Sequence, residues 1–572
     1  MVEISKEMRQ FGNEQIEVIF RKAAPPETPV PPPFRQIHYE GLKPGTTSLP
    51  RGTVLIEGGF PLPCDIVWER DVPVPLHDGI IIYIDLFRPA DGSDIPAILS
   101  WSPYGKSVPQ GPPIGVSTGT VSGLQKFEGP DPGYWCNCGY AVANVDARGA
   151  YSSQGDIHFW GAVEARDGYD VIEWVASQEW CNGKVGLSGN SWLAIVQWFI
   201  AQEQPPHLAA IAPWEGVSDL YRQDILRGGI LNIGFNEMVT SAMRGQNRVE
   251  DLPAMAQKYS IMNAYWEDKS AKLERINAPA YVVASWSNDL HTLGTLEGFR
   301  RISSKEKWLR VHNSHEWADY YEPENVEDLR RFFDRYLKSE ENDWEQTPQV
   351  RVSVLDPGGT DQVKRSESAW PLEKTQYEKL FLDAVHGILS TKPMSQESSA
   401  RYKADDVQGQ AKFTIRFDKD MELTGYLKLR LWVEAEGAED MDLFVLVQKL
   451  DAQGSPLSSP NPMGEYLGPN GRLRVSRRET DREKSFPWLP YHTHRVENLL
   501  HPGEIVPCDI PIWPTGMLWH ADEQLRLTVS GFNPIPFHLP GIPGPVTRNK
   551  GYHIIHTGGK HDSHLLVPVT PS

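Results

Sequence analysis

The chain has 572 residues, a formal net charge of −19, 40% hydrophobic residues and 19 Trp. This length and apolar content are enough to bury a large core in roughly two or three domains. The strong negative charge excludes nucleic acid as an expected partner, because nothing offsets phosphate repulsion.

The sequence also indicates where the protein resides. No segment approaches the ~20 apolar residues of a membrane span, and residues 1–7 lack a signal-peptide core. The five cysteines have no zinc-like spacing, and Cys136 and Cys138 are too close for an ordinary disulfide. We therefore expect a cytoplasmic protein with reduced thiols, no metal or organic cofactor and no membrane contact, whose partner is a small molecule. Homo-oligomer formation stays open.

Residues 1–64 contain a Pro-rich stretch, 24–34, that can form neither a helix nor a central strand. We expect this region to be an extended N-terminal arm. Beyond it, strand and helix patterns alternate, which predicts an α/β domain with a parallel sheet. The predicted strands are 80–87, 97–101, 140–146 and 209–213, and the predicted helix is 162–177.

Residues 184–203 are typical of a buried strand, a sharp turn at 189–192 and a helix. An α/β-hydrolase places its nucleophile on such a turn, where the Ser hydroxyl is exposed and the next backbone N–H faces a developing oxyanion. Ser191 occupies that position, and Gly189 supplies a small neighbour. Leu193 interrupts the short G-x-S-x-G pattern at its last residue, and Ser188 is a competing nucleophile one register earlier.

Residues 215–275 lose strand character and carry broken helical patterns, which predicts a helical cap that shapes the substrate pocket. The apolar run 279–286 then predicts a core strand, and Asn288 and Asp289 follow its carboxyl end. The next predicted strand, 307–311, ends at His312 and His315. An acid and a base thus follow the nucleophile in the order that a hydrolase triad requires.

Two of these positions have a rival. Asp289 is the preferred acid because only a carboxylate stabilises the imidazolium, while Asn288 competes for the same place. His315 is the preferred base, and His312 lies near the same strand end. The catalytic domain is expected to span 65–345 and to end with a helix at 325–338.

After residue 345 the pattern changes to alternating strands with dense Gly and Pro between them. This pattern predicts a second domain, 346–572, built as an antiparallel β-sandwich. Its clearest strands are 349–355, 424–433, 442–450 and 524–530.

Five segments carry a resemblance to a known family: 101–106 (WSPYGK), 145–149 (VDARG), 164–174 (EARDGYDVIEW), 180–186 (WCNGKVG) and 189–193 (GNSWL). They are similar to motifs of the cocaine-esterase and X-Pro dipeptidyl-peptidase family of serine hydrolases. The resemblance implies an α/β-hydrolase domain followed by a C-terminal jelly-roll domain.

The resemblance also implies roles for single residues. Ser191 matches the family nucleophile, His315 the base, and the Tyr104 hydroxyl the second oxyanion donor beside the Trp192 N–H. Trp192 replaces a family Tyr, and 285–289 matches the acid motif only with a shift of one residue.

The expected activity is hydrolysis of a small-molecule ester or amide through a Ser191–His315–Asp289 triad and an acyl-enzyme. The chain length, and the lack of a long N-terminal helical domain, favour an esterase over an X-Pro dipeptidyl-peptidase. An acyltransferase is a further alternative, because an alcohol or amine can intercept the acyl-enzyme. A non-hydrolytic catalyst or binding protein on the same fold is the alternative from another class.

Overall fold

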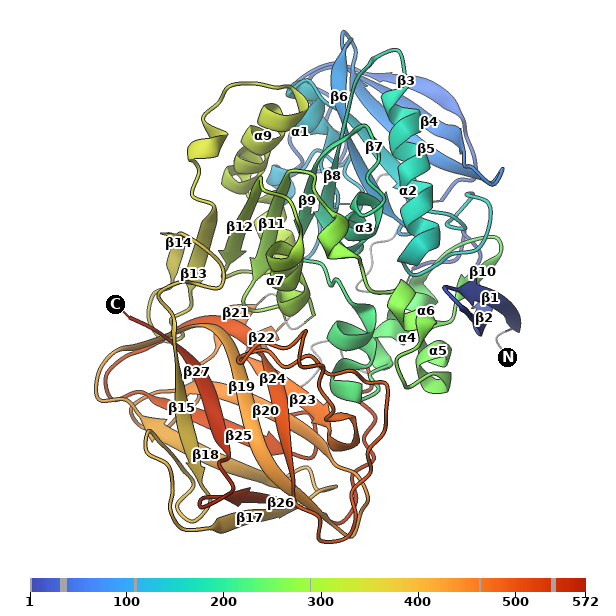
Figure 1. The fold of residues 1–572 in the computed structure, drawn as a ribbon. Coiled ribbons are helices and arrows are strands. Elements are labelled where there is room, and N and C mark those ends of the chain that lie inside the picture. Colours follow the sequence, from blue (N-terminus) through green and yellow to red (C-terminus); the bar gives the residue numbers. More distant parts are fainter. Residues whose placement is uncertain are drawn as a thin grey trace.

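The computed structural model describes residues 3–30, 39–106, 111–288, 290–461, 464–535 and 542–571. Asp289 and residues 31–34 of the Pro-rich stretch therefore lie outside the described residues. Within them, the chain forms an upper region of mixed strands and helices and a lower region built from strands (Figure 1).

The upper region is organised around an 11-stranded sheet in the order β14-β13-β12-β11-β9-β8-β6-β7-β5-β4-β3. The strands from β13 to β7 in this order run parallel, and the outer pairs β13–β14, β7–β5, β5–β4 and β4–β3 are antiparallel. Every residue of β7 and β11 is buried, as expected for parallel strands covered on both faces. The strands are β3 (Gly45–Leu49), β4 (Ile66–Pro75), β5 (Ile81–Pro89), β6 (Ile95–Ser102), β7 (Ala141–Asp146), β8 (Cys181–Asn190), β9 (Leu208–Trp214), β11 (Ala280–Ser285), β12 (Lys307–His312), β13 (Val350–Val354) and β14 (Gln362–Glu367).

Helices cover both faces of this sheet. Successive residues of β6 enter two different cores, because Leu99 packs in one buried cluster and Ile98 in the other. The first cluster includes residues of α2 (Gly161–Ala176), α3 (Trp192–Ala201) and α7 (Thr292–Arg301). The second includes residues of α1 (Pro132–Asn137), α8 (Glu316–Tyr321) and α9 (Pro323–Leu337).

Residues 215–279, between β9 and β11, form what we call the cap segment. It lies at the boundary between the two regions and contributes one short strand to a separate small sheet (Figure 1). Its elements are η2 (Tyr221–Ile225), η3 (Arg227–Gly229), α4 (Gly234–Ala242), β10 (Arg248–Glu250), α5 (Leu252–Lys258), α6 (Ala264–Asp268) and η4 (Leu273–Arg275).

The N-terminal residues contain more structure than the extended arm expected for 1–64. Strands β1 (Ile4–Phe11) and β2 (Glu14–Lys22) form an antiparallel hairpin, and β2 also pairs with β10 of the cap segment. Ile16, Val18 and Phe20 alternate along β2 and are buried. This two-residue period, next to a turn at Gly12, is a strand signal. The expectation of an extended arm rested on the Pro-rich stretch instead.

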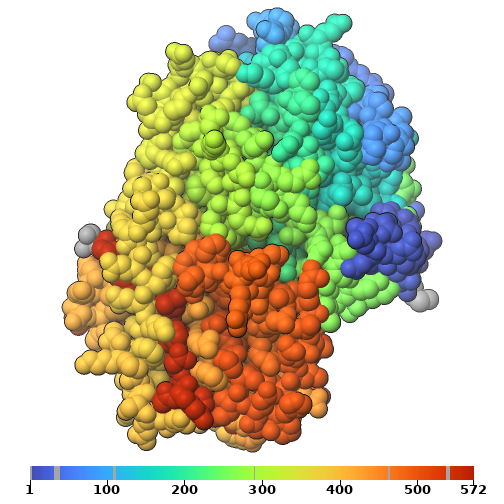
Figure 2. Space-filling model, in the orientation of Figure 1, coloured from blue at the N-terminus to red at the C-terminus, as the bar shows by residue number. Residues whose placement is uncertain are grey.

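The lower region is a second 11-stranded sheet, ordered β17-β26-β19-β24-β23-β20-β25-β18-β16-β15-β27. Because β27 also pairs with β19, the strands close into a barrel. In Figure 2, β27 appears in red. It lies between yellow residues, which include its partner β15, and orange residues from later in the chain. The strands are β15 (Gln376–Asp383), β16 (Ile388–Ser390), β17 (Ser398–Lys403), β18 (Gln410–Arg416), β19 (Met421–Glu436), β20 (Asp442–Leu450), β23 (Asn470–Arg474), β24 (Val506–Trp519), β25 (Gln524–Ser530), β26 (Tyr552–Thr557) and β27 (His564–Thr570).

The change from one sheet to the other comes later than residue 346. Strands β13 and β14 belong to the first sheet, so the barrel begins at β15. A strand pattern shows that 349–355 is extended but does not show which sheet it joins. The remaining short elements are η1 (Thr118–Thr120), η5 (Trp344–Gln346), β21 (Ser459–Asn461), β22 (Gly464–Tyr466) and η6 (Val475–Arg477).

Candidate active site

Ser191 lies on a strained turn between β8 and α3. Its φ is 52° and its ψ is −117°, a region that non-glycine residues rarely occupy. The backbone N–H of Ser191 donates to the Glu215 carbonyl at 3.0 Å, which fixes the turn against the end of β9. Gly189 has a φ of 142°, and a Cβ there would lie 2.5 Å from Leu193 Cβ. Only glycine fits this close approach of strand and helix.

Ser188, the competing nucleophile, faces the core. Its side chain is buried, and its hydroxyl is 2.7 Å from the Tyr320 hydroxyl. Ser191 instead lines a narrow cavity of about 20 Å³ together with Tyr104, Trp192 and His291. Of the two serines, Ser191 is the one that faces a cavity.

Two donors adjoin Ser191. The first N–H groups of α3, beginning at Trp192, have no acceptor within the helix and lie at the positive end of its dipole. The Tyr104 ring lies 5.8 Å from the Trp192 ring, centroid to centroid. Burial, with the nearby Glu128, Glu316 and Glu164, raises the pKa of Tyr104 well above its usual value. Tyr104 therefore keeps its proton and remains a hydrogen-bond donor.

The Trp192 side chain holds the turn in place through a hydrogen bond to a buried carboxyl group. Its indole N–H donates to Glu164 Oε1 at 3.1 Å, and Trp101 donates to the same oxygen at 2.7 Å. The Trp160 backbone N–H donates to Glu164 Oε2 at 2.8 Å. Burial raises the pKa of Glu164 to about 7 despite these donors. An indole at position 192 thus reaches a buried carboxyl group that joins α2, α3 and β6.

His315 precedes α8 and lines a cavity of about 400 Å³. This cavity shares Asp224, Phe235 and Leu290 with the cavity at Ser191, so the two adjoin. Burial, with the neighbouring His312, lowers the pKa of His315 to about 4, so the imidazole is neutral at pH 7.

The ring of His315 is not oriented to take a proton from the Ser191 hydroxyl. Its Nδ1 accepts from the Trp317 backbone N–H at 3.3 Å. Within the described ranges, no hydrogen bond joins the Ser191 hydroxyl to His315. Catalytic hydrogen bonds are often long in unliganded enzymes and tighten when substrate binds.

Asn288 holds two buried carboxyl groups rather than a histidine. Its side-chain amide donates to Glu215 Oε2 at 2.7 Å and to Glu316 Oε2 at 2.9 Å. Glu215 Oε1 lies 2.6 Å from His312 Nε2, so His312 is bound to Glu215 and does not line either cavity. Burial raises the pKa of both Glu215 and Glu316. The position of Asp289, the expected acid, lies outside the described residues.

His291 is the histidine that lines the cavity with Ser191. It is 2% exposed, and its Nε2 lies 3.7 Å from Glu316 Oε2. No hydrogen bond reaches either ring nitrogen among the described residues, and burial lowers its pKa to about 3. No sequence motif marks His291, because it belongs to the first turn after β11 and has no characteristic spacing to Ser191.

The described part of the chain holds no group of three or more His, Cys, Asp or Glu arranged to bind a metal. All five cysteines are free thiols. Among the described residues, none of the helices has both the length and the apolar character needed to cross a membrane.

Comparison with protein families gives two matches. Residues 78–316 match the X-Pro dipeptidyl-peptidase (S15 family) model, and 342–566 match the X-Pro dipeptidyl-peptidase C-terminal non-catalytic domain. The cocaine esterase of Rhodococcus sp. strain MB1 Bresler is 24% identical over 602 residues, covering 87% of this chain and 98% of that protein.

Solved structures agree with these matches. A CocE/NonD family hydrolase from Staphylococcus aureus is 37% identical, covers 96% of this chain and 99% of its own, and superimposes with a TM-score of 0.87. An alpha-amino acid ester hydrolase shares the fold, with a TM-score of 0.66 at 15% identity over 88% of this chain and 97% of its own. The protein is therefore a hydrolytic enzyme, and the chain belongs to the cocaine esterase and X-Pro dipeptidyl-peptidase family.

Proposed function

We propose that the protein is a serine hydrolase that cleaves a small-molecule carboxylic ester through an acyl-enzyme on Ser191. The strained conformation of Ser191, at the start of α3 and facing a cavity, is the observation that carries this proposal. On this reading the upper region is an α/β-hydrolase domain and the barrel a jelly-roll domain.

The first chemical step is attack of Ser191 Oγ on the substrate carbonyl, with His315 taking the proton. The Trp192 N–H and the Tyr104 hydroxyl then donate to the oxyanion. Removing one such donor typically costs about 10² to 10³ in rate. The raised pKa of Tyr104 supports this role, because a phenolate could not donate. His315 next protonates the leaving group and activates the water that releases the acid.

His315 acts as the base at Nε2 only when its own proton sits on Nδ1. The Trp317 N–H that now donates to Nδ1 must then give way to an acceptor. We propose Asp289 for this acceptor, because it follows β11 in the chain and a carboxylate also stabilises the imidazolium. Asn288 suits the role less, because its amide already bridges Glu215 and Glu316.

The proposal is tested by exposing the protein to a fluorophosphonate probe and mapping the labelled residue by mass spectrometry. We expect one label, on Ser191, and loss of both labelling and ester hydrolysis in Ser191→Ala. Ser188→Ala is the matched control, because Ser188 contacts Tyr320 in the core. Label on Ser188, or substantial hydrolysis by folded Ser191→Ala, would refute the assignment.

Peptidase and acyl-transfer activities are the alternatives for the same acyl-enzyme. An X-Pro dipeptidyl-peptidase releases para-nitroaniline from a dipeptide anilide, whereas an esterase prefers para-nitrophenyl esters. Adding an alcohol or amine separates hydrolysis from transfer, because a transferase forms the new ester or amide faster than the free acid. We expect ester hydrolysis to dominate both comparisons.

A further inference from the structure

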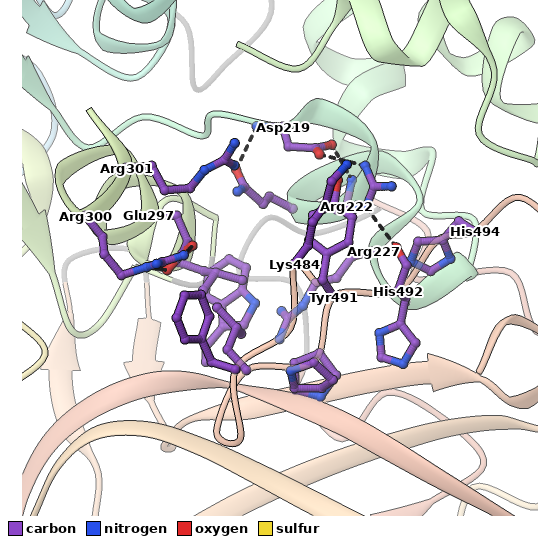
Figure 3. Close-up of a pocket in the computed structure, with 18 of the residues that line it drawn as sticks. Asp219, Arg222, Arg227, Glu297, Arg300, Arg301, Lys484, Tyr491, His492 and His494 are labelled. Atoms are coloured by element: carbon purple, nitrogen blue, oxygen red, sulfur yellow. Dashed lines mark hydrogen bonds and ion pairs between the residues drawn. The ribbon is translucent and has the colours of Figure 1, made fainter. Parts of the chain in front are cut away.

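A second large cavity lies between the cap segment, α7 and the C-terminal barrel (Figure 3). Its volume is about 350 Å³, which falls in the range of small-molecule sites, roughly 300–1,000 Å³. Figure 3 places Glu297 and Arg300 of α7 on one side, and Arg222, Arg227 and Tyr491 on the other. Contributions from separate parts of the chain are typical of ligand sites at domain interfaces.

Positive charge dominates this cavity, although the chain as a whole carries a net charge of −19. Among the described lining residues, six are cationic and three are acidic. His492 and His494 also line it, but burial lowers the pKa of both, so they add no charge at neutral pH. The cationic residues are Arg222, Arg227, Arg300, Arg301, Arg472 and Lys484.

Two of the acidic residues are already engaged by two of the arginines. Asp219 Oδ2 lies 2.9 Å from Arg222 Nη1, and Glu297 Oε2 lies 2.5 Å from Arg300 Nη2. The third, Glu483, is exposed and neighbours Lys484 in the chain. In the described part of the molecule, Lys484 has no ion-pair partner. Arg301 also has an ion-pair partner, Glu274, which lies 3.5 Å away and does not line the cavity. The cationic side chains of the described lining still outnumber the acidic ones by six to three.

Flat apolar surfaces lie beside these cations. The Arg227 guanidinium is 4.0 Å from the centroid of the Trp513 ring, and Lys484 Nζ is 5.2 Å from that of Tyr491. Arg300 lies 4.4 Å from the Phe486 ring. A guanidinium held flat against an aromatic ring still presents its edge N–H groups, which match the two oxygens of a carboxylate or phosphate.

The cavity continues towards the catalytic residues. Gln223, Arg227 and Arg472 line both this cavity and the one that contains His315. A ligand whose anionic end binds among the arginines can therefore extend into the adjoining cavity, which His315 lines. This continuity distinguishes the cavity from an isolated surface hollow.

We propose that this cavity binds an organic anion with an apolar body, and that the anion is the distal end of the ester substrate. The chemistry of the site requires an anionic group for the surplus of Arg and Lys and an aryl or alkyl portion for Trp513, Tyr491 and Phe486. The link to the substrate rests on the proposed function, whereas binding of the anion does not.

Binding is tested by calorimetry on Ser191→Ala, which removes the proposed nucleophile and leaves this cavity intact. The probes are phenylhexanoate, phenylhexyl phosphate and the neutral phenylhexanamide. We expect at least one anion to bind roughly 10-fold more tightly than the amide, and more weakly as salt rises. The carboxylate and phosphate arms tell the two anion types apart.

Lys484→Gln removes one cation from an exposed position and should weaken anion binding roughly 10-fold. Lys560→Gln, an exposed lysine outside the lining, is the matched control and should leave it unchanged. Equal affinity for anions and amide, or no effect of Lys484→Gln, overturns the anion site.

The link to the substrate is tested on the wild-type enzyme with two para-nitrophenyl esters of equal chain length, octanoate and the monoester of octanedioic acid. We expect a higher kcat/KM for the acidic ester, and loss of that preference in Lys484→Gln. Anion binding without any preference overturns the substrate assignment. Failure to hydrolyse either ester instead counts against the proposed function, and the calorimetric result then stands alone.

Discussion

At the scale of single residues, Tyr104 combines two properties that an oxyanion donor needs: it lines the cavity at Ser191 and it keeps its proton. Tyr104→Phe removes only the hydroxyl. We expect kcat on short aryl esters to fall by about 10² to 10³ with little change in KM. Steady-state kinetics on one activated ester measure this. An unchanged kcat would exclude Tyr104 from the reaction.

His315 and His291 both lie near the nucleophile, and their substitution by alanine has different expected results. If His315 is the base, His315→Ala abolishes turnover and His291→Ala, at a buried position, mainly lowers stability. His291 lines the cavity with Ser191, whereas His315 lines the adjoining one. Parallel measurement of kcat and melting temperature on both variants decides between them. Loss of turnover only in a folded His291→Ala protein would transfer the role of base to His291.

The surroundings of His315 also predict a pH profile. Its pKa is lowered from 6.5 to about 4 by burial, with a contribution from His312. A base must be neutral to accept a proton, so activity is kept as the pH falls below 6.5 and is lost near pH 4. We expect the acid limb of kcat/KM, which reports the free enzyme, to have its midpoint there. A midpoint near 6.5 would contradict this environment.

Substitution of Asp289 and of Asn288 tests which of the two residues acts as the acid of the triad. Asp289→Asn should cut kcat severely, on the order of 10⁴-fold where this change inverts the histidine tautomer in another triad enzyme. Asn288→Ala should mainly destabilise the fold, because it leaves Glu215 and Glu316 short of a donor, at a cost of about 1–3 kcal/mol. Kinetics and chemical denaturation on both variants test this. Near-wild-type kcat in Asp289→Asn would remove Asp289 from the triad.

At the scale of elements, the sequence predicted the strand–turn–helix unit at Ser191 closely. The predicted strand 209–213 and helix 162–177 are likewise confirmed as β9 and α2. Buried strands and amphipathic helices leave a strong local pattern, which explains this success. The contacts among Asn288, Glu215 and Glu316 could not be predicted from the sequence, because these residues meet only through folding and have no shared spacing.

The turn itself is open to a direct test. Gly189→Ala places a Cβ 2.5 Å from Leu193 Cβ at a φ of 142°. We expect loss of activity and a melting temperature lower by several degrees, since such strain costs roughly 1–3 kcal/mol. Gly45→Ala is the matched control, because nothing lies within 4 Å of a Cβ there. Equal behaviour of the two variants would mean that the turn relaxes freely.

At the scale of the whole molecule, the two sheets are joined through a shared boundary rather than a flexible linker. The Leu355 N–H donates to the Gly516 carbonyl at 2.8 Å, which connects the end of β13 to β24 of the barrel. The Tyr426 hydroxyl of β19 donates to Glu297 of α7 at 2.8 Å. The strand patterning near residue 345 indicated a second domain, but it could not reveal that β13 and β14 complete the first sheet.

This boundary predicts that the upper region does not fold as a soluble, active fragment. Truncation before β15 keeps β13 and β14 but uncovers Trp286 and Trp370, whose rings lie 5.6 Å apart. Both are buried in the full chain, and an aromatic side chain carries roughly 150–250 Å² of largely apolar surface. The same cut removes Arg472 and Trp513 from the anion cavity, so the distal site would be lost with the barrel. We expect insoluble or inactive protein, measured by the soluble fraction and ester hydrolysis beside the full chain. A soluble fragment with full activity would show that the barrel is an independent appendage and that catalysis needs neither its cover nor its cavity.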